Sequence, residues 1–369
     1  MISSEYLKLK AKEIFEKSLS IKYHYTSNKT AKKLLKNLEQ EKGKLDKKSK
    51  KLAKEYAQDV LGWKGFAPWL YVYTHMYGEF KEGWLPDNYF GKIVIPEIQG
   101  DYGKISFLKP FANKLFNSQV CPDLAHYING QWFSSNYEIR TEKEINKLIK
   151  TNCTYNNAKI INKLDYSYQG LGIHIYDKDN FNAQQVAKNG NGVIQPFIIQ
   201  HEFFSEFCKD AVATLRLTTV MDTLGKASLR ASLLRLGRTK QTHVQSSDQV
   251  LVAIDIKTGN LSEIGYSSSF KSMYAHPDTN TPFKNQTIPY YDNCVAKVLE
   301  LQNKMPMIKL IGWDVVIDNK NEVVIMEWNG YGAGVAFSEA TQGPSFNDLG
   351  WNDYYKDKSV KKLILSKLK

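Results

Sequence analysis

The stretch Ile311–Gly330 reads IGWDVVIDNKNEVVIMEWNG, two apolar runs separated by the polar residues Asp318–Glu322. This is the pattern of a β-hairpin, in which two antiparallel strands are joined by a turn. Asp314 lies near the start of the first strand, whereas Glu327 and Asn329 lie at the far end of the second. Antiparallel pairing therefore predicts that the three polar side chains meet at one edge of a sheet, with Glu327 and Asn329 on the same face.

This edge of the hairpin is a candidate magnesium site. Carboxylate and amide oxygens suit Mg²⁺, which takes few ligands from a protein and the others from phosphate and water. The sequence therefore predicts Asp314, Glu327 and Asn329 as metal ligands. The competing interpretation is a hairpin whose polar ends are simply solvated.

A second segment, Lys163–Ile175, reads KLDYSYQGLGIHI and has the pattern of a strand, a glycine-containing loop and another strand. Gly170 and Gly172 would let backbone N–H groups approach a phosphate closely, and Lys163 would add a positive charge. The alternative is that the glycines serve only the backbone geometry of a turn. The loop is neither a Walker loop nor a dinucleotide-binding fingerprint.

A third segment, Val193–Glu202, reads VIQPFIIQHE and is apolar until its polar end. Its backbone is a candidate for hydrogen bonding to the edge of an adenine base, with Glu202 accepting from ribose hydroxyls. The same pattern is also typical of an ordinary buried strand.

Two arginines lie in apolar surroundings, Arg216 in TLRLTT and Arg235 in LRLG. An arginine between apolar neighbours needs an anionic partner inside the fold. The partner is either a phosphoryl group of a ligand or an internal carboxylate.

Composition indicates a globular protein, since 42% of the 369 residues are hydrophobic and 24% are charged. No apolar run reaches the roughly 18 residues of a membrane span. The four cysteines are far apart without a CxxC pair, and lysines occupy the place where a secretion signal would be apolar. We therefore expect a cytoplasmic protein.

The net charge of +12 is concentrated at the ends of the chain. Residues 1–60 contain 16 lysines against 8 acidic residues, and residues 356–369 contain 6 lysines against one. A nucleic-acid partner is not expected, because its groove would need basic and aromatic residues on the folded body. In residues 31–40, Leu34, Leu35 and Leu38 lie at helical spacing beneath a lysine-rich face. This fits either peripheral contact with anionic lipid at the inner face of the membrane or packing onto the body.

Elsewhere the sequence alternates helical and strand-like patterns. Residues 4–60 favour two or three helices with breaks near Thr26–Asn28 and Gly43. Short apolar runs that begin with Lys92–Pro96 and recur towards the C-terminus are strand-like. The predicted fold class is α+β.

Taken in order, these segments resemble the ATP-grasp superfamily, and more closely its sugar-transfer associated branch, over about residues 100–350. The motifs that carry the resemblance are Asn113-Lys114-Leu-Phe, Lys163 with Gln169–Gly172, the 195–202 hinge, TLRLTT, LRLG, Ala275-His-Pro277, Ile288-Pro, Gly312-Trp-Asp and Glu327-Trp-Asn. The resemblance implies an ATP-grasp fold with a lid subdomain and a C-terminal α+β domain. The expected domains are a basic helical region at 1–60, an N-terminal subdomain at 61–115, the lid at 116–194 and the C-terminal domain at 195–369.

The family resemblance also implies roles for single residues. It implies that the ATP phosphates contact Lys114, Lys163, Gly170 and Gly172. Adenine would be held by the backbone around Gln195, Phe197 and Ile198, and the ribose by Glu202. For catalysis, it points to Asp314, Glu327 and Asn329 as Mg²⁺ ligands and to Arg216, with Arg235, at the transferring phosphoryl group. The match departs at Gln241–Asp248, where relatives carry an Asp-Asn pair and then a glycine pair, and this departure concerns the acceptor side.

The implied activity is that of an ATP- and Mg²⁺-dependent carboxylate–amine ligase in surface polysaccharide or sugar modification. Its substrates would be a sugar acid or an amino acid, and an amine. The alternatives are a sugar kinase of the same fold and a non-catalytic nucleotide-binding component of a glycan-assembly complex.

Overall fold

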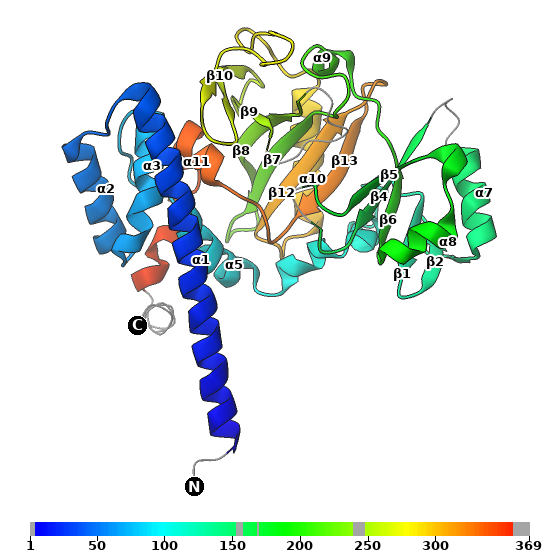
Figure 1. Ribbon diagram of the computed structural model, residues 1–369, viewed down its shortest axis with the longest axis horizontal. Coiled ribbons are helices and arrows are strands. Elements are labelled where there is room, and N and C mark those ends of the chain that lie inside the picture. Colours follow the sequence, from blue (N-terminus) through cyan, green and yellow to red (C-terminus); the bar gives the residue numbers. More distant parts are fainter. Residues whose placement is uncertain (1–3, 153–157, 168–169, 239–247, 357–369) are drawn as a thin grey trace. The chain divides into compact units, whose positions relative to one another are not determined.

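The computed structural model describes residues 4–152, 158–167, 170–238 and 248–356 (Figure 1). Helices and antiparallel sheets both contribute, which confirms the α+β class. The chain forms two compact units: unit 1 is Met1–Gly100 with Ser269–Lys271 and Gly334–Lys369, and unit 2 is Asp101–Ser268 with Ser272–Ala333. The domain boundaries expected after residues 60, 115 and 194 stay predictions.

Unit 1 is helical. Its α-helices are α1 (Ser4–Lys42), α2 (Lys47–Asp59), α3 (Ala67–Tyr77), α4 (Asp87–Tyr89), α5 (Ile95–Gln99) and α11 (Ala336–Gln342). The apolar run Lys92–Pro96, predicted to be a strand, is instead a π-helical turn that leads into α5. Ile93, Val94 and Ile95 are buried, so a short apolar run supplies a helical core here, and periodicity alone does not distinguish the two cases.

Helix α1 is unbroken through Thr26–Asn28, so the break predicted there is wrong, whereas the break predicted at Gly43 is confirmed, since α1 ends at Lys42. The polar side chains in this region, which compete with helix hydrogen bonds in isolation, are used in tertiary contacts instead. Ser27 Oγ accepts from Trp69 Nε1 at 2.8 Å, and Asn28 Nδ2 donates to the Gly65 carbonyl at 2.9 Å.

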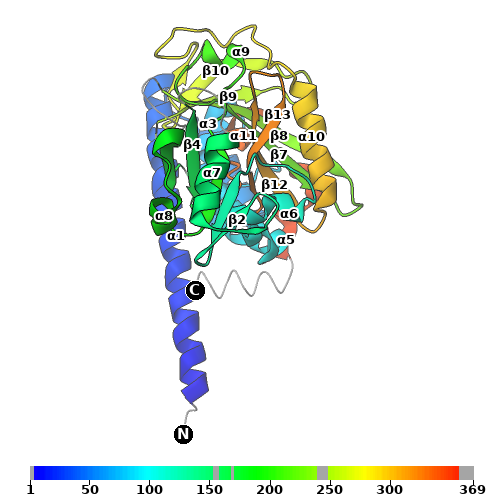
Figure 2. The ribbon, with the colours of Figure 1, turned by 90° about the vertical axis from the view of Figure 1, so that its right-hand side faces the viewer.

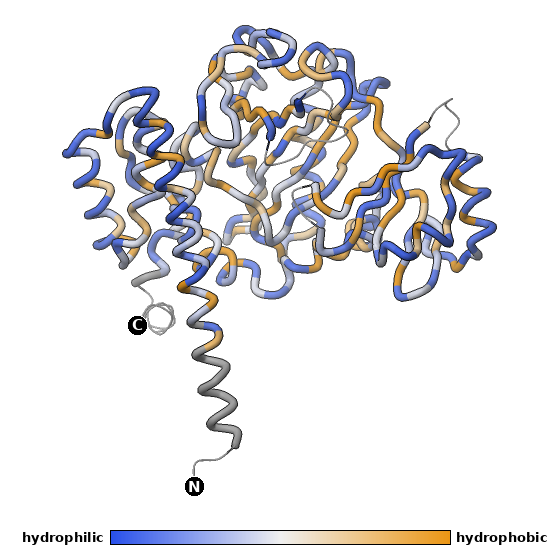
Figure 3. Tube along the Cα trace, in the orientation of Figure 1, coloured by the Kyte–Doolittle hydropathy of each residue, from blue (hydrophilic) through white to orange (hydrophobic). Residues whose placement is uncertain are grey.

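The apolar residues of α1 from Ala31 to Leu38 face the interior of unit 1, whereas Phe15, Leu19, Ile21 and Tyr25 are exposed. Ala31, Leu34 and Leu38 are buried, and Leu35 is partly buried. Hydrophilic and apolar residues accordingly alternate along this helix (Figure 3). Of the two interpretations of these leucines, the structure supports packing onto the body. No helix in the described ranges combines the length and apolarity needed to cross a membrane.

Unit 2 contains two antiparallel sheets. The first has the order β3-β2-β1-β6-β4-β5. Its strands are β1 (Ala125–Ile128), β2 (Gln131–Ser134), β3 (Ile139–Arg140), β4 (Lys159–Leu164), β5 (Ile173–Asp177) and β6 (Gly192–Pro196). Helices α7 (Glu142–Asn152) and α8 (Ala183–Val186) contribute Ile145, Ile149 and Val186 to a shared apolar core with this sheet.

The second sheet has the order β11-β10-β9-β8-β7-β12-β13. Its strands are β7 (Thr214–Met221), β8 (Ala227–Leu236), β9 (Val250–Ile254), β10 (Leu261–Ser267), β11 (Ser272–Met273), β12 (Leu310–Ile317) and β13 (Val323–Asn329). Helix α10 (Tyr291–Lys304) packs along one face, as Figure 2 shows. The short helices α6 (Ala112–Leu115) and α9 (Glu202–Ser205) complete the unit.

Strand alternation gives the seven-stranded sheet two different faces. Leu217 pairs with Trp313, and Leu215 pairs with Val315, and all four side chains are buried in the core that includes α10. The residues between them point to the opposite side. That opposite side carries the charged residues of the candidate site.

Candidate active site

Four of the predicted charged residues, together with Asn329, lie on one face of the seven-stranded sheet. Arg216, Asp314 and Glu327 are direct cross-strand partners on β7, β12 and β13. Asn329 is two residues beyond Glu327, and Arg235 on β8 pairs with Thr214, two residues from Arg216, so both share this face. We call these five residues the polar face. The predicted convergence of Asp314, Glu327 and Asn329 is therefore present in the fold.

Asp314 is the centre of the polar face. Arg216 donates to both of its carboxylate oxygens, through Nε at 2.8 Å and Nη2 at 3.0 Å. Arg235 Nη1 and Asn329 Nδ2 each donate at 3.4 Å. Burial alone would raise the pKa of Asp314, but Arg216 and Arg235 outweigh burial and lower it. The sequence predicted either a ligand phosphoryl group or an internal carboxylate as the partner of Arg216. In this structure the partner is the carboxylate of Asp314.

Gly312 makes room for the Arg216 side chain. A Cβ atom at this position would lie 3.2 Å from Arg216 Nη1 and 3.1 Å from the Ala333 Cβ. The glycine of Gly312-Trp313-Asp314 thus leaves room beside the strand for the guanidinium that contacts Asp314. The tryptophan of the same motif points to the opposite, apolar face.

Arg235 lacks a full set of partners. Its Nε is buried and has no hydrogen-bond acceptor among the described residues. Burial, and after it the neighbouring charge of Arg216, lower the pKa of Arg235 to about 10. Two arginines thus share one carboxylate, and an additional anion would stabilise this site.

Lys163 on β4 reaches β13 at a break in its regular pairing. Asp314 pairs with Glu327 but Val315 pairs with Ile325, so Met326 is an extra residue on β13, as in a β-bulge. Lys163 Nζ donates to the Met326 carbonyl at 3.2 Å. The lysine is 4% exposed, and no ion pair to it occurs within the described ranges. Burial lowers its pKa, and Glu327 partly offsets this effect.

Sequence reasoning missed Lys109. Its Nζ donates to Glu327 Oε1 at 2.6 Å and to the Ser167 carbonyl at 3.4 Å, and its backbone N–H donates to Asp165 Oδ1 at 3.0 Å. Lys114, which the sequence favoured for this role, is exposed on α6, with its Nζ 5.8 Å from the centre of the Tyr137 ring. Lys109 begins the short helical turn Lys109–Phe111, Lys114 lies in α6, and no local sequence pattern predicts which of the two lysines faces inward.

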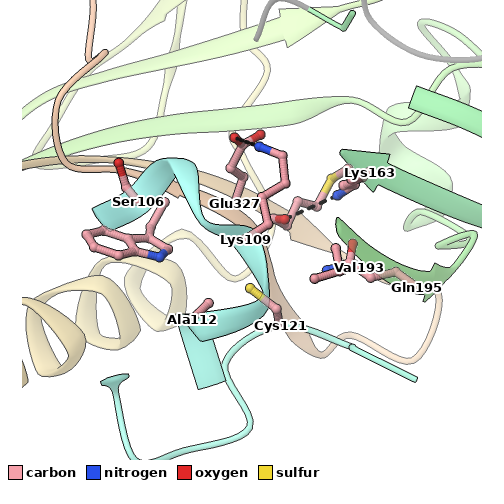
Figure 4. A pocket seen from close by; sticks show the side chains of 10 residues that line it. Ser106, Lys109, Ala112, Cys121, Lys163, Val193, Gln195 and Glu327 are labelled. Carbon is pink, nitrogen blue, oxygen red and sulfur yellow. Dashed lines mark hydrogen bonds and ion pairs between the residues drawn. The ribbon is translucent and has the colours of Figure 1, made fainter. Parts of the chain in front are cut away.

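Lys109, Lys163 and Glu327 line a cavity together with Gln195, Val193 and Cys121 (Figure 4). The space open to the centre of a water molecule is about 10 Å³, which is room for about one water. A larger ligand would therefore require the side chains around the cavity to move apart. Cys121 is buried, and burial raises the pKa of its thiol, so it lines the wall as a neutral group.

The loop between β4 and β5 lies beside Lys109. Tyr166 N–H donates to the Phe107 carbonyl at 3.0 Å, which ties the loop to the segment that carries Lys109. Gly170 and Gly172 have positive φ values of 81° and 71°, and a Cβ at Gly172 would lie 2.7 Å from the Ser167 Cβ. The loop geometry therefore requires glycine at 172, with or without a phosphate ligand.

Only some of the predicted ATP-binding residues in the 195–202 hinge line the cavity. Gln195 on β6 is buried and lines it, whereas Phe197 and Ile198 are partly buried beyond the strand. Phe197 N–H already donates to the Lys159 carbonyl at 2.9 Å. Glu202 is exposed at the start of α9 and does not line the cavity. Most of Gln241–Asp248, where the family pattern is interrupted, lies outside the described residues.

The donor set of the polar face fits Mg²⁺. It offers two carboxylates and one amide oxygen, because Asn329 Nδ2 points to Asp314 and to the Gly312 carbonyl and leaves Oδ1 available. The described residues contain no group of three His, Cys, Asp or Glu side chains placed for a metal. In this arrangement arginine and lysine side chains occupy the carboxylates that a metal would bind.

Comparisons with known proteins support the family resemblance. Residues 183–349 match the model of the family described as sugar-transfer associated ATP-grasp. A search of curated proteins finds no match.

Several solved structures are similar. Biotin carboxylase from Campylobacter jejuni is 8% identical with a TM-score of 0.42, covering 68% of this chain and 47% of that one. N5-carboxyaminoimidazole synthetase from Staphylococcus aureus complexed with ADP is 10% identical with a TM-score of 0.40, covering 69% and 52%. The ATP-grasp ligase PsnB with a minimal precursor is 10% identical with a TM-score of 0.39, covering 69% and 64%. The chain thus spans about half to under two thirds of these proteins, and TM-scores this low carry no conclusion about activity.

The matched residues include the hinge, both arginines and the three predicted metal ligands, whereas Lys109 and Lys163 precede them. The resemblance of this chain to the sugar-transfer associated ATP-grasp family is confirmed over residues 183–349.

Proposed function

We propose that the protein is an ATP- and Mg²⁺-dependent carboxylate–amine ligase that modifies sugars or surface polysaccharide. The observation that carries the proposal is the excess of positive charge around the cavity and the polar face. Lys109, Lys163, Arg216 and Arg235 lie here against two carboxylates, Asp314 and Glu327. Such an excess in a desolvated site suits a polyphosphate ligand.

Lys163 and Lys109 contact the phosphates in this proposal. Lys163 is buried with one neutral partner, so a phosphate would supply the counter-charge that it lacks. Lys109 would transfer from Glu327 to a phosphate once the carboxylate binds a cation. Lys114, which the family motif favoured, is the less supported choice because it points away to Tyr137.

Asp314, Glu327 and Asn329 would hold Mg²⁺. When bound, Mg²⁺ offsets part of the negative charge on the ATP phosphates. Arg216 keeps Asp314 ionised and in place, which the bidentate contact supports. Arg235, with its unpartnered Nε, is then free to bind the transferring phosphoryl group or a substrate carboxylate.

The proposed reaction has two steps and needs no covalent enzyme intermediate. An oxygen of the substrate carboxylate bonds to the γ-phosphorus while the bond from this phosphorus to the bridging oxygen breaks, which yields an acyl phosphate and ADP. The amine nitrogen then attacks the acyl carbon. Phosphate leaves with the bonding electrons and the nitrogen loses a proton, which leaves an amide.

The remaining ATP contacts follow the family pattern. The backbone around Gln195, Phe197 and Ile198 would hold adenine, Glu202 the ribose, and the loop with Gly170 and Gly172 the phosphates. The position of Gln195 at the cavity supports the first assignment. Glu202 would have to approach on binding, since it is exposed and lies away from the cavity.

A mass-spectrometric screen of sugar-acid or amino-acid substrates with amines, in the presence of ATP and Mg²⁺, tests the reaction. ADP, phosphate and an amide are expected. ADP with a phosphorylated sugar would establish the kinase alternative. Absence of ATP turnover with any pair, in a protein that still binds ATP, would favour the non-catalytic component.

We also propose a peripheral contact between unit 1 and an anionic membrane surface. It rests on the exposed lysines of α1, among them Lys29, Lys32, Lys33 and Lys36. Leu34 and Leu38 beneath them are buried and Leu35 is partly buried, so at these lysines the contact would be electrostatic rather than insertion of an apolar face.

A further inference from the structure

A buried polar network lies behind the cavity wall at Gln195. Asp123, which precedes β1, is 3% exposed. Its Oδ1 accepts from Gln195 Nε2 at 2.7 Å. Its Oδ2 accepts from Asn113 Nδ2 at 3.2 Å and from His126 Nε2 at 3.1 Å. One carboxylate therefore accepts from three side-chain nitrogens, and none of the functions discussed so far uses it.

Asn113 and His126, which donate to Asp123, make further contacts of their own. Asn113 Oδ1 accepts from the backbone N–H groups of Val120 and Cys121, both at 2.8 Å, so its amide nitrogen has to face Asp123. His126 is fully buried, and its ring stacks on Tyr137 with 4.8 Å between ring centres. Among the described residues, Asp123 thus accepts from Asn113 and His126 on Oδ2 and from Gln195 on Oδ1.

This arrangement determines which atom of Gln195 is left for a ligand. A carboxylate only accepts hydrogen bonds, so the amide nitrogen of Gln195 has to point to Asp123. Gln195 lines the cavity, and no described residue donates to its Oε1. The oxygen is therefore the carboxamide atom that meets a bound molecule, and it accepts hydrogen bonds.

Gln195 and Lys163 lie on the same face of the six-stranded sheet. Lys163 pairs with Val193, and Gln195 is two residues further along β6. Two residues of a strand span about 7 Å. A nucleotide whose phosphate contacts Lys163 could therefore bring its base to Gln195.

We propose that Asp123 is a positioning residue that fixes Gln195 as a hydrogen-bond acceptor, so that the cavity selects a purine with an amino group over one with a carbonyl. This inference rests on nucleotide binding as proposed above. An amino group would donate to Gln195 Oε1, whereas a carbonyl would place two acceptors against each other and leave both unsatisfied.

The substitution Asp123→Asn should reverse the orientation of Gln195. The two fixed donors on the Oδ2 side hold the new amide oxygen there, so the new amide nitrogen faces Gln195. In this variant Gln195 has to turn its own oxygen towards that nitrogen, and its amide nitrogen then faces the cavity. The site would now favour a carbonyl.

The test compares the dissociation constants of ATP and ITP, measured by calorimetry with Mg²⁺ on the full chain. The wild type should prefer ATP, and Asp123→Asn should lower the preference by about tenfold or more, as expected when one hydrogen bond is lost and a mismatch is relieved. Backbone contacts to the base are common to both proteins and cancel in the ratio. Asp222→Asn is the matched control, because Asp222 accepts from backbone N–H groups in a turn outside the cavity and should leave the ratio unchanged.

If the melting temperature shows that Asp123→Asn does not fold, a second variant provides the test. Gln195→Met removes both donor and acceptor at similar size and should abolish the contribution to base preference. An unchanged ATP-to-ITP ratio in a folded Asp123→Asn or in Gln195→Met overturns the inference. Equal binding of ATP and ITP by the wild type overturns it while leaving nucleotide binding intact, and binding of neither overturns the proposed function as well.

Discussion

Asp314 stabilises the buried Arg216 and the partly buried Arg235 as well as serving as a predicted metal ligand. Replacing its charge leaves Arg216 without its bidentate partner. We expect Asp314→Asn to lower the free energy of unfolding by about 3 kcal/mol or more, the usual cost of an uncompensated buried charge. Glu327→Gln should cost about 1 kcal/mol, because Glu327 is 30% exposed and forms an ion pair with a single lysine among the described residues.

Urea denaturation without nucleotide, with Mg²⁺-dependent ATP binding measured in parallel, checks this prediction. Both variants should lose the Mg²⁺ dependence of binding, but only Asp314→Asn should be markedly less stable. Equal stability of the two variants would contradict the central place of Asp314 in the polar face.

Lys163 is expected to strengthen ligand binding but to lower the stability of the ligand-free protein. It is buried with a single carbonyl partner, so Lys163→Met should leave the ligand-free protein as stable as the wild type or more stable. The same variant should bind ATP about 10-fold to 100-fold more weakly, since a charge-assisted contact contributes roughly 1.5–3 kcal/mol.

Thermal melts with and without ATP measure both effects at once. Lys109→Met is the matched comparison, because it removes an ion pair with Glu327 and should destabilise the ligand-free protein. A loss of stability in Lys163→Met without any loss of ATP affinity would show that the lysine is structural.

Among the helices, α11 is held by a buried carboxylate. Glu339 accepts from the backbone N–H groups of Leu85 at 2.8 Å and Ser345 at 2.9 Å. Burial raises its pKa from 4.5 to about 8, against the opposing effect of these hydrogen bonds. The folded chain therefore keeps a proton that the unfolded chain loses above about pH 4.5.

The sign of the resulting pH dependence follows from this difference. The contribution of Glu339 to stability is full below about pH 4.5 and is lost as the pH rises through about 8. The loss is on the order of a few kcal/mol. The melting temperature should fall between pH 5 and 9, and Glu339→Gln should flatten this part of the profile. A profile of the same slope in the variant would assign the pH dependence to other groups.

At the scale of the whole molecule, the lysines of unit 1 have to be tested without removing α1. Deletion of residues 1–50 would expose the surface that Ala31, Leu34 and Leu38 cover, so we expect it to lower the melting temperature markedly. Replacement of Lys29, Lys32, Lys33 and Lys36 by glutamine keeps this packing, because all four side chains are exposed. The variant should melt like the wild type.

Binding to anionic vesicles at low salt is the measurement. The quadruple variant should lose most of the binding, at up to about 1 kcal/mol for each near-surface lysine. The matched control replaces four exposed lysines of unit 2 that lie on separate turns and loops, Lys209, Lys226, Lys257 and Lys320. Equal loss in both variants would indicate a general charge effect, and no loss in either would exclude the proposed contact.

The sequence by itself determined the features that depend on local alternation. The β12–β13 hairpin and the convergence of Asp314, Glu327 and Asn329 at one edge follow from antiparallel pairing and the two-residue period of a strand, and the structure confirms this arrangement. The pairing of Arg216 with Asp314 came from the structure. The α+β class and the end of α1 at Gly43 follow from similarly local patterns. The ligand roles of these residues stay predictions.

Only the tertiary structure decided which groups meet from distant segments. Lys109 rather than Lys114 reaches Glu327, and a local pattern could not predict this contact because the two residues are more than 200 positions apart in the chain. Ser27 and Asn28 remain helical because their side chains form hydrogen bonds with Trp69 and with the Gly65 carbonyl. Lys92–Pro96 is helical because it packs into a helical core. Asp123 fixes Gln195 through contacts with Asn113 and His126 that no short pattern encodes. The physical reason is that periodicity reports the environment of one element, whereas ion pairs and hydrogen-bond networks depend on how elements pack together.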